Sequence, residues 1–552
     1  MNSQNKNYDI IIIGAGHNGL VNACYLQKAG LNVLVLEKND WIGGAAVSRE
    51  LTPNILYSNC SYVCSLFRPE IMRDLELPKH GLQIIGIEGG TTFTQDGKYL
   101  ANYRNYHSKR REMSRFSVKD SEAYERYSRD VTRQCRFIQP LLMRTAPDPA
   151  SFKPKDIGEI FYLIKQFNEL SPDQMAETIR FWTMSISDYL DEYFENDVIK
   201  ASLALSGIIG TALGPMSPGT AYVLLHHYMG EVDGSIGSWG YARGGMGAIT
   251  QALSSSFKSF GGELITESEV ENILIKNNQA KGVVLKNGNE FYSSNIVSNA
   301  DVKRTFLKLV DDKFLPPSFV KKVKNFKIRG SSGKVNIGLD SMPDFPAVPK
   351  GDPCIKGDIH FTDSIERMEK AYDDWKNGTW SQDPFLDMMI PTATDPTMAP
   401  PGKHFMSCFV QYCPPKVYGK DWTQEKKEAF GETVIKQIED YSPGFREKII
   451  HMEIRTPKEL EDEVGLTEGN IFQGELTFDQ LLFNRPVPGY AQYRSPLKGL
   501  YICGSSTHPG GGVMGAPGRN AAIEILKDLK KPTSHARSAY EVILCDYYWG
   551  RT

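Results

Sequence analysis

The sequence lacks the features that commonly identify membrane-spanning, secreted and nucleic-acid-binding proteins. It has no run of about 18 uninterrupted apolar residues, the length that a spanning helix requires. Its opening stretch, MNSQNKNYDI, is polar, so we expect neither a secretory signal nor a mitochondrial presequence. The chain has 63 Lys and Arg against 66 Asp and Glu, and no basic stripe occurs. We therefore expect no nucleic-acid partner and a cytoplasmic location.

Cysteine is also scarce and shows no ligand pattern. The 552 residues include nine cysteines, and the only close pairs are Cys60/Cys64 and Cys408/Cys413. Neither pair is joined to a second pair, as a structural zinc site would require. His226 and His227 are adjacent on a predicted apolar helix and would point to different faces of it. We expect reduced cysteines and no metal.

The richest pattern lies in residues 8–50. The apolar run Ile10 to Ile13 predicts a buried parallel strand. A G-x-G-x-x-G motif follows, then a predicted helix from Leu20 to Ala29 and a second strand from Asn32 to Leu36. The three glycines permit a tight turn, close approach of a pyrophosphate, and close packing of helix on strand. The order strand, glycines, helix, strand is that of a dinucleotide-binding βαβ unit.

An acidic residue and a second glycine pair extend this motif. Glu37 ends the second predicted strand, where a carboxylate accepts hydrogen bonds from the adenosine ribose. Gly43, Gly44 and Arg49 favour FAD over NAD, because many flavoproteins have a glycine pair beside the ribityl chain. The predicted cofactor-binding residues of this segment are Gly14, Gly16, His17, Asn18, Gly19, Glu37, Lys38, Gly43, Gly44, Ala45 and Arg49.

A second glycine-rich motif, YICGSSTHPGGGVMGAPGRNAA, lies near the C-terminus. Three consecutive glycines are costly to order, so we expect them to serve a close backbone approach to the flavin. The helix that follows would direct its positive N-terminal end at the reduced flavin, and Arg519 either adds to that field or forms an outward salt bridge. The predicted cofactor contacts here are Gly504, Ser505, Gly512, Val513 and Met514.

Three segments together resemble a known group of enzymes. They are the N-terminal fingerprint, HHYMGEVDGSIGSWGYARGGMGAITQAL in the middle, and NRPVPGYAQYRSPLKGLYICGSSTHPGGGVMGAPGRNAA. They are similar to the phytoene desaturase-related FAD-dependent oxidoreductases of the flavin amine oxidase superfamily. Within that group they look most like the branch named for a pyridine nucleotide-disulphide oxidoreductase domain. No C-x-x-C pair follows the first helix, so disulphide reduction is not supported.

The resemblance implies an α/β fold, with a Rossmann-like FAD-binding domain and an interleaved α+β substrate domain of the amine oxidase/phytoene desaturase type. The FAD domain would combine residues 1–75, 236–305 and 495–530, and Val270 would contact adenine through its backbone. Residues 76–235 and 306–494 would form the substrate domain. Residues 531–552 would form a C-terminal tail. A hairpin is predicted at Asn287-Gly288.

Two residues are candidates for catalysis. Lys334 stands in an apolar strand and looks like the amine oxidase lysine that holds a water at flavin N5. Burying a lysine without a partner is costly, which favours a role, although an edge-strand lysine reaching solvent is equally compatible. His508 is expected next to the flavin, as a proton carrier or as a structural hydrogen-bond donor.

The substrate prediction depends on Gly512. Aligned from Thr507-His508, amine oxidases carry an aromatic cage residue where this chain has Gly512. A glycine would leave room for an extended apolar substrate, either polyene-like or fatty acyl, that is desaturated, saturated or isomerised. The alternatives are a peroxide-producing flavin amine oxidase and a flavin-binding assembly factor without turnover.

Two segments suggest contacts beyond the substrate. Residues 152–170 place Ile157, Ile160, Phe161, Ile164 and Phe167 at helical spacing beside lysines. This pattern suits a helix lying at a membrane surface, although a helix packed on the core is commoner. The tail SAYEVILCDYYWGRT is apolar and aromatic, as an interface such as a homodimer contact would be.

Overall fold

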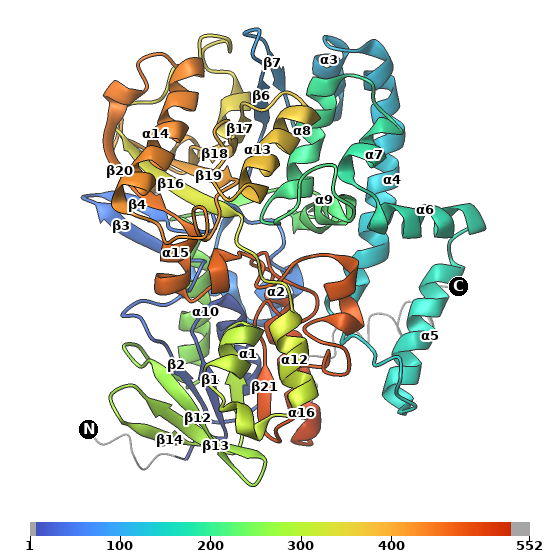
Figure 1. Cartoon of the computed structure of the whole chain (residues 1–552), viewed down its shortest axis with the longest axis vertical. Coiled ribbons are helices and arrows are strands. Elements are labelled where there is room, and N and C mark those ends of the chain that lie inside the picture. Colours follow the sequence, from blue (N-terminus) through green and yellow to red (C-terminus); the bar gives the residue numbers. More distant parts are fainter. Residues whose placement is uncertain (1–6, 532–552) are drawn as a thin grey trace.

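The computed structural model describes residues 7–531. Its lower layer in Figure 1 is a five-stranded parallel sheet of order β11-β2-β1-β15-β21. These strands come from three separate stretches of chain, so the N-terminal, middle and C-terminal glycine-rich segments converge on one sheet. The strands are β1 (Ile10–Ile13), β2 (Val33–Leu36), β11 (Glu263–Ile265), β15 (Ile296–Ser298) and β21 (Leu500–Ile502).

The side chains of β1 are apolar on both faces because other elements pack against both faces of the sheet. Ile10 and Ile12 pack in a core with α1 (His17–Lys28), α10 (Gly247–Ser259) and α16 (Ala516–Asp528). Ile11 and Ile13 pack in a second core on the opposite face. That core includes α11 (Val302–Leu307), α12 (Pro317–Asn325) and a meander of β12 (Val270–Lys276), β13 (Gln279–Leu285) and β14 (Glu290–Tyr292). The predicted hairpin at Asn287-Gly288 joins β13 to β14, so that prediction is confirmed.

The upper layer contains a mixed seven-stranded sheet of order β20-β16-β19-β18-β17-β6-β7 (Figure 1). Its strands are β6 (Gly90–Phe93), β7 (Tyr99–Ala101), β16 (Ser332–Leu339), β17 (Asp358–His360), β18 (Phe385–Met389), β19 (His404–Gln411) and β20 (Ile449–Arg455). On one face, the helix α14 (Gln424–Tyr441) shares an apolar core with the sheet. The other face is turned toward the candidate site.

Helices and short strand pairs complete the molecule. The helices are α2 (Pro69–Asp74), α3 (Tyr106–Ser114), α4 (Val118–Leu142), α5 (Pro154–Asn168), α6 (Pro172–Thr183), α7 (Ile186–Asp191), α8 (Asp197–Ile208), α9 (Thr220–Tyr228), α13 (Ile365–Lys376) and α15 (Pro457–Glu459). The pairs are β3 (Ser48–Thr52) with β4 (Ile55–Ser58), β5 (Ile84–Gly86) with β10 (Gly240–Ala242), and β8 (Glu231–Val232) with β9 (Ser235–Ile236). Within residues 7–531, no helix combines the length and apolar character needed to cross a bilayer.

The helix α5 has two apolar faces rather than one. Phe167 is half-buried and packs on the large helical core. Phe161 and Ile164 are 65% and 46% exposed, and Phe152, just before the helix, is 92% exposed. Lys155 does not face outward freely, because its Nζ lies 3.4 Å from a carboxylate oxygen of Glu524 on α16. The apolar residues that the sequence places at helical spacing therefore belong to two different faces of α5, one packed on the core and one pointing outward.

Candidate active site

The first glycine-rich turn is built for a backbone that approaches closely. Gly14 has φ +95°, a conformation that L side chains rarely adopt. A Cβ on Gly19 would lie 2.3 Å from the Gly14 carbonyl oxygen, so α1 can pack against β1 only with glycine there. The helix begins at His17, and its N-cap residue Gly16 offers no side-chain cap. The first amides of α1 therefore remain available to a pyrophosphate.

Glu37 lies beside this turn at the end of β2. Its Oε2 accepts a hydrogen bond from Ala15 N–H at 2.8 Å, and its Oε1 accepts one from Asn39 N–H at 3.0 Å. Burial raises its pKa, and these backbone hydrogen bonds oppose that rise. Each carboxylate oxygen keeps a second lone pair, so the oriented group can still accept a hydrogen bond from a ribose hydroxyl.

The other predicted contacts of the N-terminal segment surround the same turn. Gly43 forms a β-bridge with Gly16, and Ser268 N–H donates to the Glu37 carbonyl at 2.7 Å two residues before Val270 begins β12. Lys38 and Arg49 lie farther out. Lys38 Nζ donates to the Asp462 carbonyl at 2.8 Å, and Arg49 pairs with Glu463 and stacks on Trp41.

The two ends of the chain are in direct contact. Asn18 Nδ2 donates to Ser505 Oγ at 3.2 Å, across 487 residues of sequence. A Cβ on Gly518 would lie 2.2 Å from the Asn18 carbonyl, so α16 presses its first turn against α1. The N-cap of α16, Gly515, provides no side-chain cap either. Two uncapped helix N-termini thus belong to the same glycine-rich region. Arg519 is buried within α16 and donates to the Met143 carbonyl at 3.3 Å, so its side chain points into the protein rather than outward.

The glycine at position 512 has close neighbours on the side where a side chain would project. It has φ +110°, and a Cβ there would lie 2.5 Å from Leu66 Cδ1 and 3.4 Å from His226 Nε2. Leu66 and His226 therefore fill the volume that an aromatic side chain would need. Gly512 itself lines the cavity described next, so the expectation that it makes room for a longer substrate stays a prediction.

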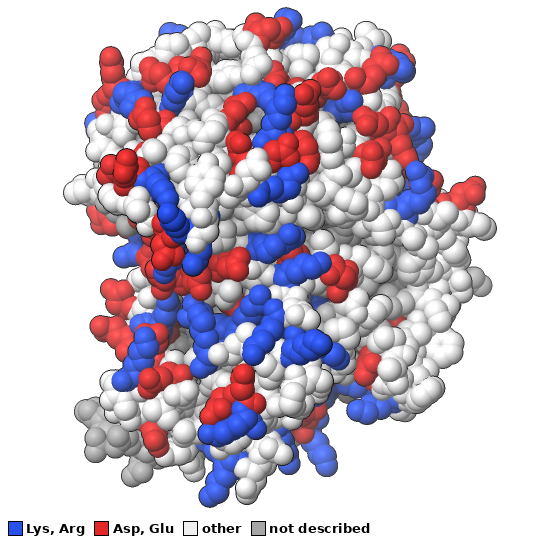
Figure 2. All heavy atoms as spheres, viewed as in Figure 1, with Lys and Arg blue, Asp and Glu red and all other residues white. Residues whose placement is uncertain are grey.

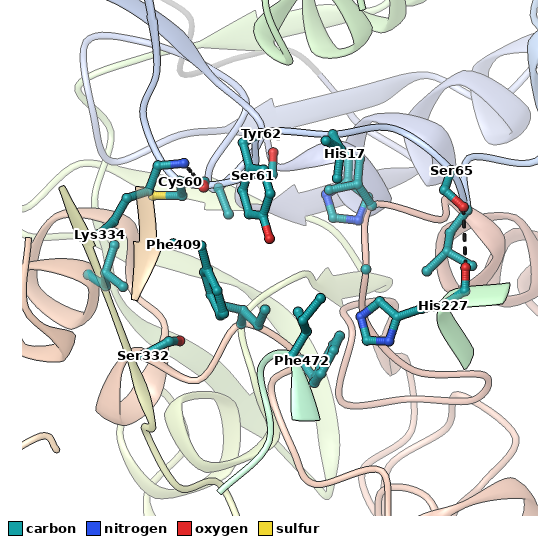
Figure 3. A pocket seen from close by; sticks show the side chains of 18 of the residues that line it. His17, Cys60, Ser61, Tyr62, Ser65, His227, Ser332, Lys334, Phe409 and Phe472 are labelled. Carbon is teal, nitrogen blue, oxygen red and sulfur yellow. Dashed lines mark hydrogen bonds between the residues drawn. The ribbon is translucent and has the colours of Figure 1, made fainter. Parts of the chain in front are cut away.

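A cavity of about 110 Å³ lies between the two layers (Figure 3). Its walls include the predicted cofactor contacts His17, Ala45, Gly512 and Val513 on one side, and Lys334 on the other. The remaining lining residues are Cys60, Ser61, Tyr62, Val63, Ser65, Leu66, Ile209, His227, Trp239, Ser332, Gly333, Phe409, Leu460, Ile471 and Phe472. The fold therefore brings Lys334 to the same space as both glycine-rich segments.

Lys334 is fixed in the interior of the seven-stranded sheet. Its strand β16 pairs with β19 on one side and β20 on the other, so it is not an edge-strand residue. Nζ donates to the Cys60 carbonyl at 2.7 Å and to Ser407 Oγ at 2.8 Å, and it lies 4.6 Å from the centre of the Tyr62 ring. Burial lowers the pKa of Lys334 to about 8. The ammonium therefore titrates close to neutral pH.

His508 does not line this cavity. Its Nε2 bonds to the Leu141 carbonyl at 3.0 Å, and its own carbonyl accepts a hydrogen bond from the Tyr493 hydroxyl at 2.8 Å. Burial lowers its pKa to about 4. Of the two roles weighed for His508, these contacts match the structural hydrogen-bond donor that ties the glycine-rich loop to α4.

Sequence reasoning missed the aromatic walls. Tyr62 and Phe409 stack with centroids 5.8 Å apart, and in Figure 3 both lie beside Lys334. Tyr62 O–H donates to Asp387 Oδ2 at 2.5 Å. One signal was available in the sequence. Asp387 stands in the apolar strand FLDMM just as Lys334 stands in GKVNIGL, so the reasoning that selected the lysine applied equally to the acid.

Comparison with known proteins agrees with this geometry. The sequence profile described as NAD(P)-binding Rossmann-like domain matches residues 12–75, and the one described as flavin containing amine oxidoreductase matches residues 163–526. The chain belongs to the flavin-containing amine oxidoreductase family. Its cofactor is FAD, its fold class is as predicted, and it is an oxidoreductase.

Individual relatives refine this assignment. Pyridine nucleotide-disulfide oxidoreductase domain-containing protein 2 of Rattus norvegicus is 39% identical over 550 residues, which are 95% of this chain and 94% of the relative. Phytoene desaturase (lycopene-forming) of Pantoea ananas is 24% identical over 542 residues, 94% and 99% of the two chains. Cyclohexylamine oxidase from Brevibacterium oxydans has the same fold, with TM-score 0.56, 16% identity and coverage of 95% and 100%. The predicted branch and superfamily are confirmed.

The chain's own residues fit FAD. Three features support this fit. A Cβ at Gly19 or Gly518 would clash with backbone, the first turns of α1 and α16 have no side-chain cap, and Glu37 is held in one orientation by hydrogen bonds. Buried polar atoms without a partner among the described residues include Nε2 of His17 and Oδ1 of Asn18. All of these features lie around the glycine-rich turn, where a polar cofactor would supply partners.

Proposed function

We propose that the chain catalyses FAD-dependent oxidation of an unsaturated, largely apolar substrate, of polyene or acyl type. The observation that carries the proposal is the composition of the cavity wall. Among the described lining residues none is a carboxylate, and most are apolar or aromatic. Burial lowers the pKa of both His17 and His227 to about 4, so both rings are neutral at pH 7. Such a wall favours a hydrocarbon over an ammonium ion.

The reaction divides between cofactor and protein. FAD held by the glycine-rich turns and Glu37 would supply a two-electron acceptor, so that loss of a hydride and a proton from the substrate would leave a new double bond. The protein positions the substrate between Gly512-Val513 and the Tyr62–Phe409 pair. Lys334 Nζ, held by the Cys60 carbonyl and Ser407, can bind or release a proton near pH 8. Phe472 and Ile471 exclude water from the same space.

Amine oxidation is the second candidate. It is favoured by the buried Lys334 and by the aromatic side chains of Tyr62 and Phe409 in the cavity wall. It is opposed by the absence of a carboxylate among the described residues of the wall.

Product analysis distinguishes oxidation of an apolar substrate from oxidation of an amine. The proposal predicts that mass spectrometry finds a hydrocarbon or acyl product two hydrogens lighter, and no aldehyde or peroxide on mixing with aliphatic amines. Aldehyde formation from an amine at comparable rate would contradict it.

Delivery of the substrate from a membrane surface belongs to the same proposal. It is supported by the outward face of α5, where Phe161 and Ile164 are exposed. Figure 2 shows few charged side chains over α6 and the adjoining part of α5. The predicted homodimer contact is the C-terminal tail, residues 531–552, which apart from Lys531 lies outside the described residues.

A further inference from the structure

A second, larger cavity adjoins the one beside Lys334. Its volume is about 310 Å³, and Ile209 and Trp239 line both cavities. Its polar lining differs sharply from the apolar wall of the first. The titratable residues on it are Glu88, Tyr103, Arg104, Lys109, Tyr124, Tyr127, Tyr228, Asp358, His360 and Asp387.

One row of residues across the seven-stranded sheet forms the floor of both cavities. Lys334 on β16 lies opposite Phe409 on β19, and Phe409 lies opposite Asp387 on β18. The antiparallel register Ile359↔Met388 then places His360 on β17 opposite Asp387. Neighbouring strands are about 4.8 Å apart and side chains at matching positions share a face. The row therefore passes from the lysine of the apolar cavity to the acid and histidine of the polar one.

Tyr62 connects the two cavities directly. Its ring lines the apolar cavity, below the Lys334 ammonium and against Phe409. Its hydroxyl donates to Asp387 Oδ2, which lines the polar cavity. An elongated ligand lying along this floor would have its apolar part over Tyr62 and Phe409 and one end at Asp387.

Asp387 has an unused acceptor at that position. Its side chain is 2% exposed, and its Oδ1 has no hydrogen-bond partner among the described residues; the nearest cation is His360, with Nε2 4.0 Å away. Tyr127, on α4, lines the same cavity, and its hydroxyl is also buried and has no partner among the described residues. Two buried polar groups of this kind indicate a ligand that hydrogen-bonds with both.

The charges of the cavity identify the kind of ligand. Both ring nitrogens of His360 face acceptors, Leu386 O at 3.1 Å and Asp358 Oδ2 at 2.9 Å, so the ring is protonated. The cations His360, Lys109 and Arg104 then balance the acids Asp358, Asp387 and Glu88. A neutral ligand end that both donates and accepts hydrogen bonds matches this balance better than a charged one. A hydroxyl group has that chemistry.

We propose that the polar cavity binds the hydroxyl-bearing end of an elongated, otherwise apolar substrate, with Asp387 Oδ1 accepting and the Tyr127 hydroxyl donating hydrogen bonds to it. This inference rests on the proposed function for the identity of the apolar part. It narrows the substrate class from unsaturated, largely apolar compounds to unsaturated alcohols.

Binding to the FAD-loaded protein tests this assignment. The probes are farnesol and three analogues of the same chain: farnesene without a head group, farnesylamine and farnesoic acid. Their dissociation constants are measured from changes in the flavin absorbance. We expect farnesol to bind about tenfold more tightly than farnesene, the effect of one or two net hydrogen bonds. In Tyr127→Phe and Asp387→Asn that preference falls to threefold or less, while farnesene binding is unchanged.

The control is Tyr292→Phe, which removes the same hydroxyl from an exposed residue of β14 and should leave the preference intact. Flavin content and melting temperature confirm that each variant is folded, and the two cavity variants provide independent tests. Equal binding of farnesol and farnesene would overturn the assignment, and so would tightest binding of the amine or the acid. Flavin reduction is scored separately: selectivity for the alcohol without reduction contradicts the proposed reaction alone, and reduction without selectivity contradicts the cavity assignment alone.

Discussion

At the scale of single residues, the site depends on polar groups placed in an apolar sheet. Lys334 could be selected from the sequence because a lysine in an apolar strand needs a partner. Its partners could not be predicted, since Cys60 and Ser407 lie 274 and 73 residues away along the chain. His508 shows the opposite limitation. Its position in the glycine-rich motif was informative, but the direction of its ring depends on packing against α4.

Lys334 makes a testable contribution to the pH dependence of stability. Its pKa is about 8 in the folded protein and 10.5 ordinarily, because burial disfavours the charge. Between these pH values the unfolded chain binds more protons than the folded one, so stability rises with pH across this window. In Lys334→Met, which keeps the side-chain volume, this contribution is absent. Melting temperatures at pH 7.5 and 9.5 should show wild type gaining on the variant at the higher pH. An equal change in both would contradict the buried-lysine assignment.

At the scale of elements, local patterns predicted local structure well. The strand Ile10–Ile13 and the hairpin of β13 and β14 form as expected, since neighbouring residues determine each of them. The helix α1 starts at His17, three residues before the predicted start, because the chain turns from the extended N-cap residue Gly16 directly into the helix, within the glycine motif itself. The seven-stranded sheet could not be derived in this way. Its register joins strands from residues 90 to 455, and no local pattern specifies those pairings.

The contact between α1 and α16 gives a prediction at this scale. In Gly518→Ala the new methyl group would overlap the Asn18 carbonyl, so we expect destabilisation of about 1–3 kcal/mol and reduced FAD occupancy. Gly158→Ala on α5 is the matched control. It is the same substitution within a helix, with no atom within 4 Å of the added carbon, and should leave FAD occupancy unchanged. Thermal denaturation and the absorbance ratio of flavin to protein provide the measurements. Equal behaviour of the two variants would refute close packing at the cofactor turn.

At the scale of the whole molecule, the fold places the cavity beside Lys334 between the layer of the five-stranded sheet and the layer of the seven-stranded sheet. The sequence predicted that both ends of the chain meet at the cofactor, and Asn18 and Ser505 are hydrogen-bonded. The predicted domain boundaries stay a prediction. What the sequence could not supply is the second cavity, because its lining combines β17 and β18 with residues of the helices α4 and α8.

The outward face of α5 leads to a prediction about the molecule as a whole. If the substrate is taken from a bilayer, the wild-type protein should co-sediment with lipid vesicles, and Phe161→Asp with Ile164→Asp should reduce the bound fraction severalfold. Ile450→Asp is the control, because Ile450 is as exposed as Ile164 but lies on β20. Equal loss in the control, or no sedimentation of the wild type, would contradict membrane delivery.

The most direct test of the proposed function is an anaerobic titration of the FAD-loaded protein with unsaturated alcohols and hydrocarbons, and with aliphatic amines. The absorbance of oxidised flavin near ~450 nm is followed, since the redox chemistry belongs to the cofactor. We predict loss of this band with at least one unsaturated apolar compound and no loss with the amines. Loss of the band with amines alone would contradict the assignment of an apolar substrate.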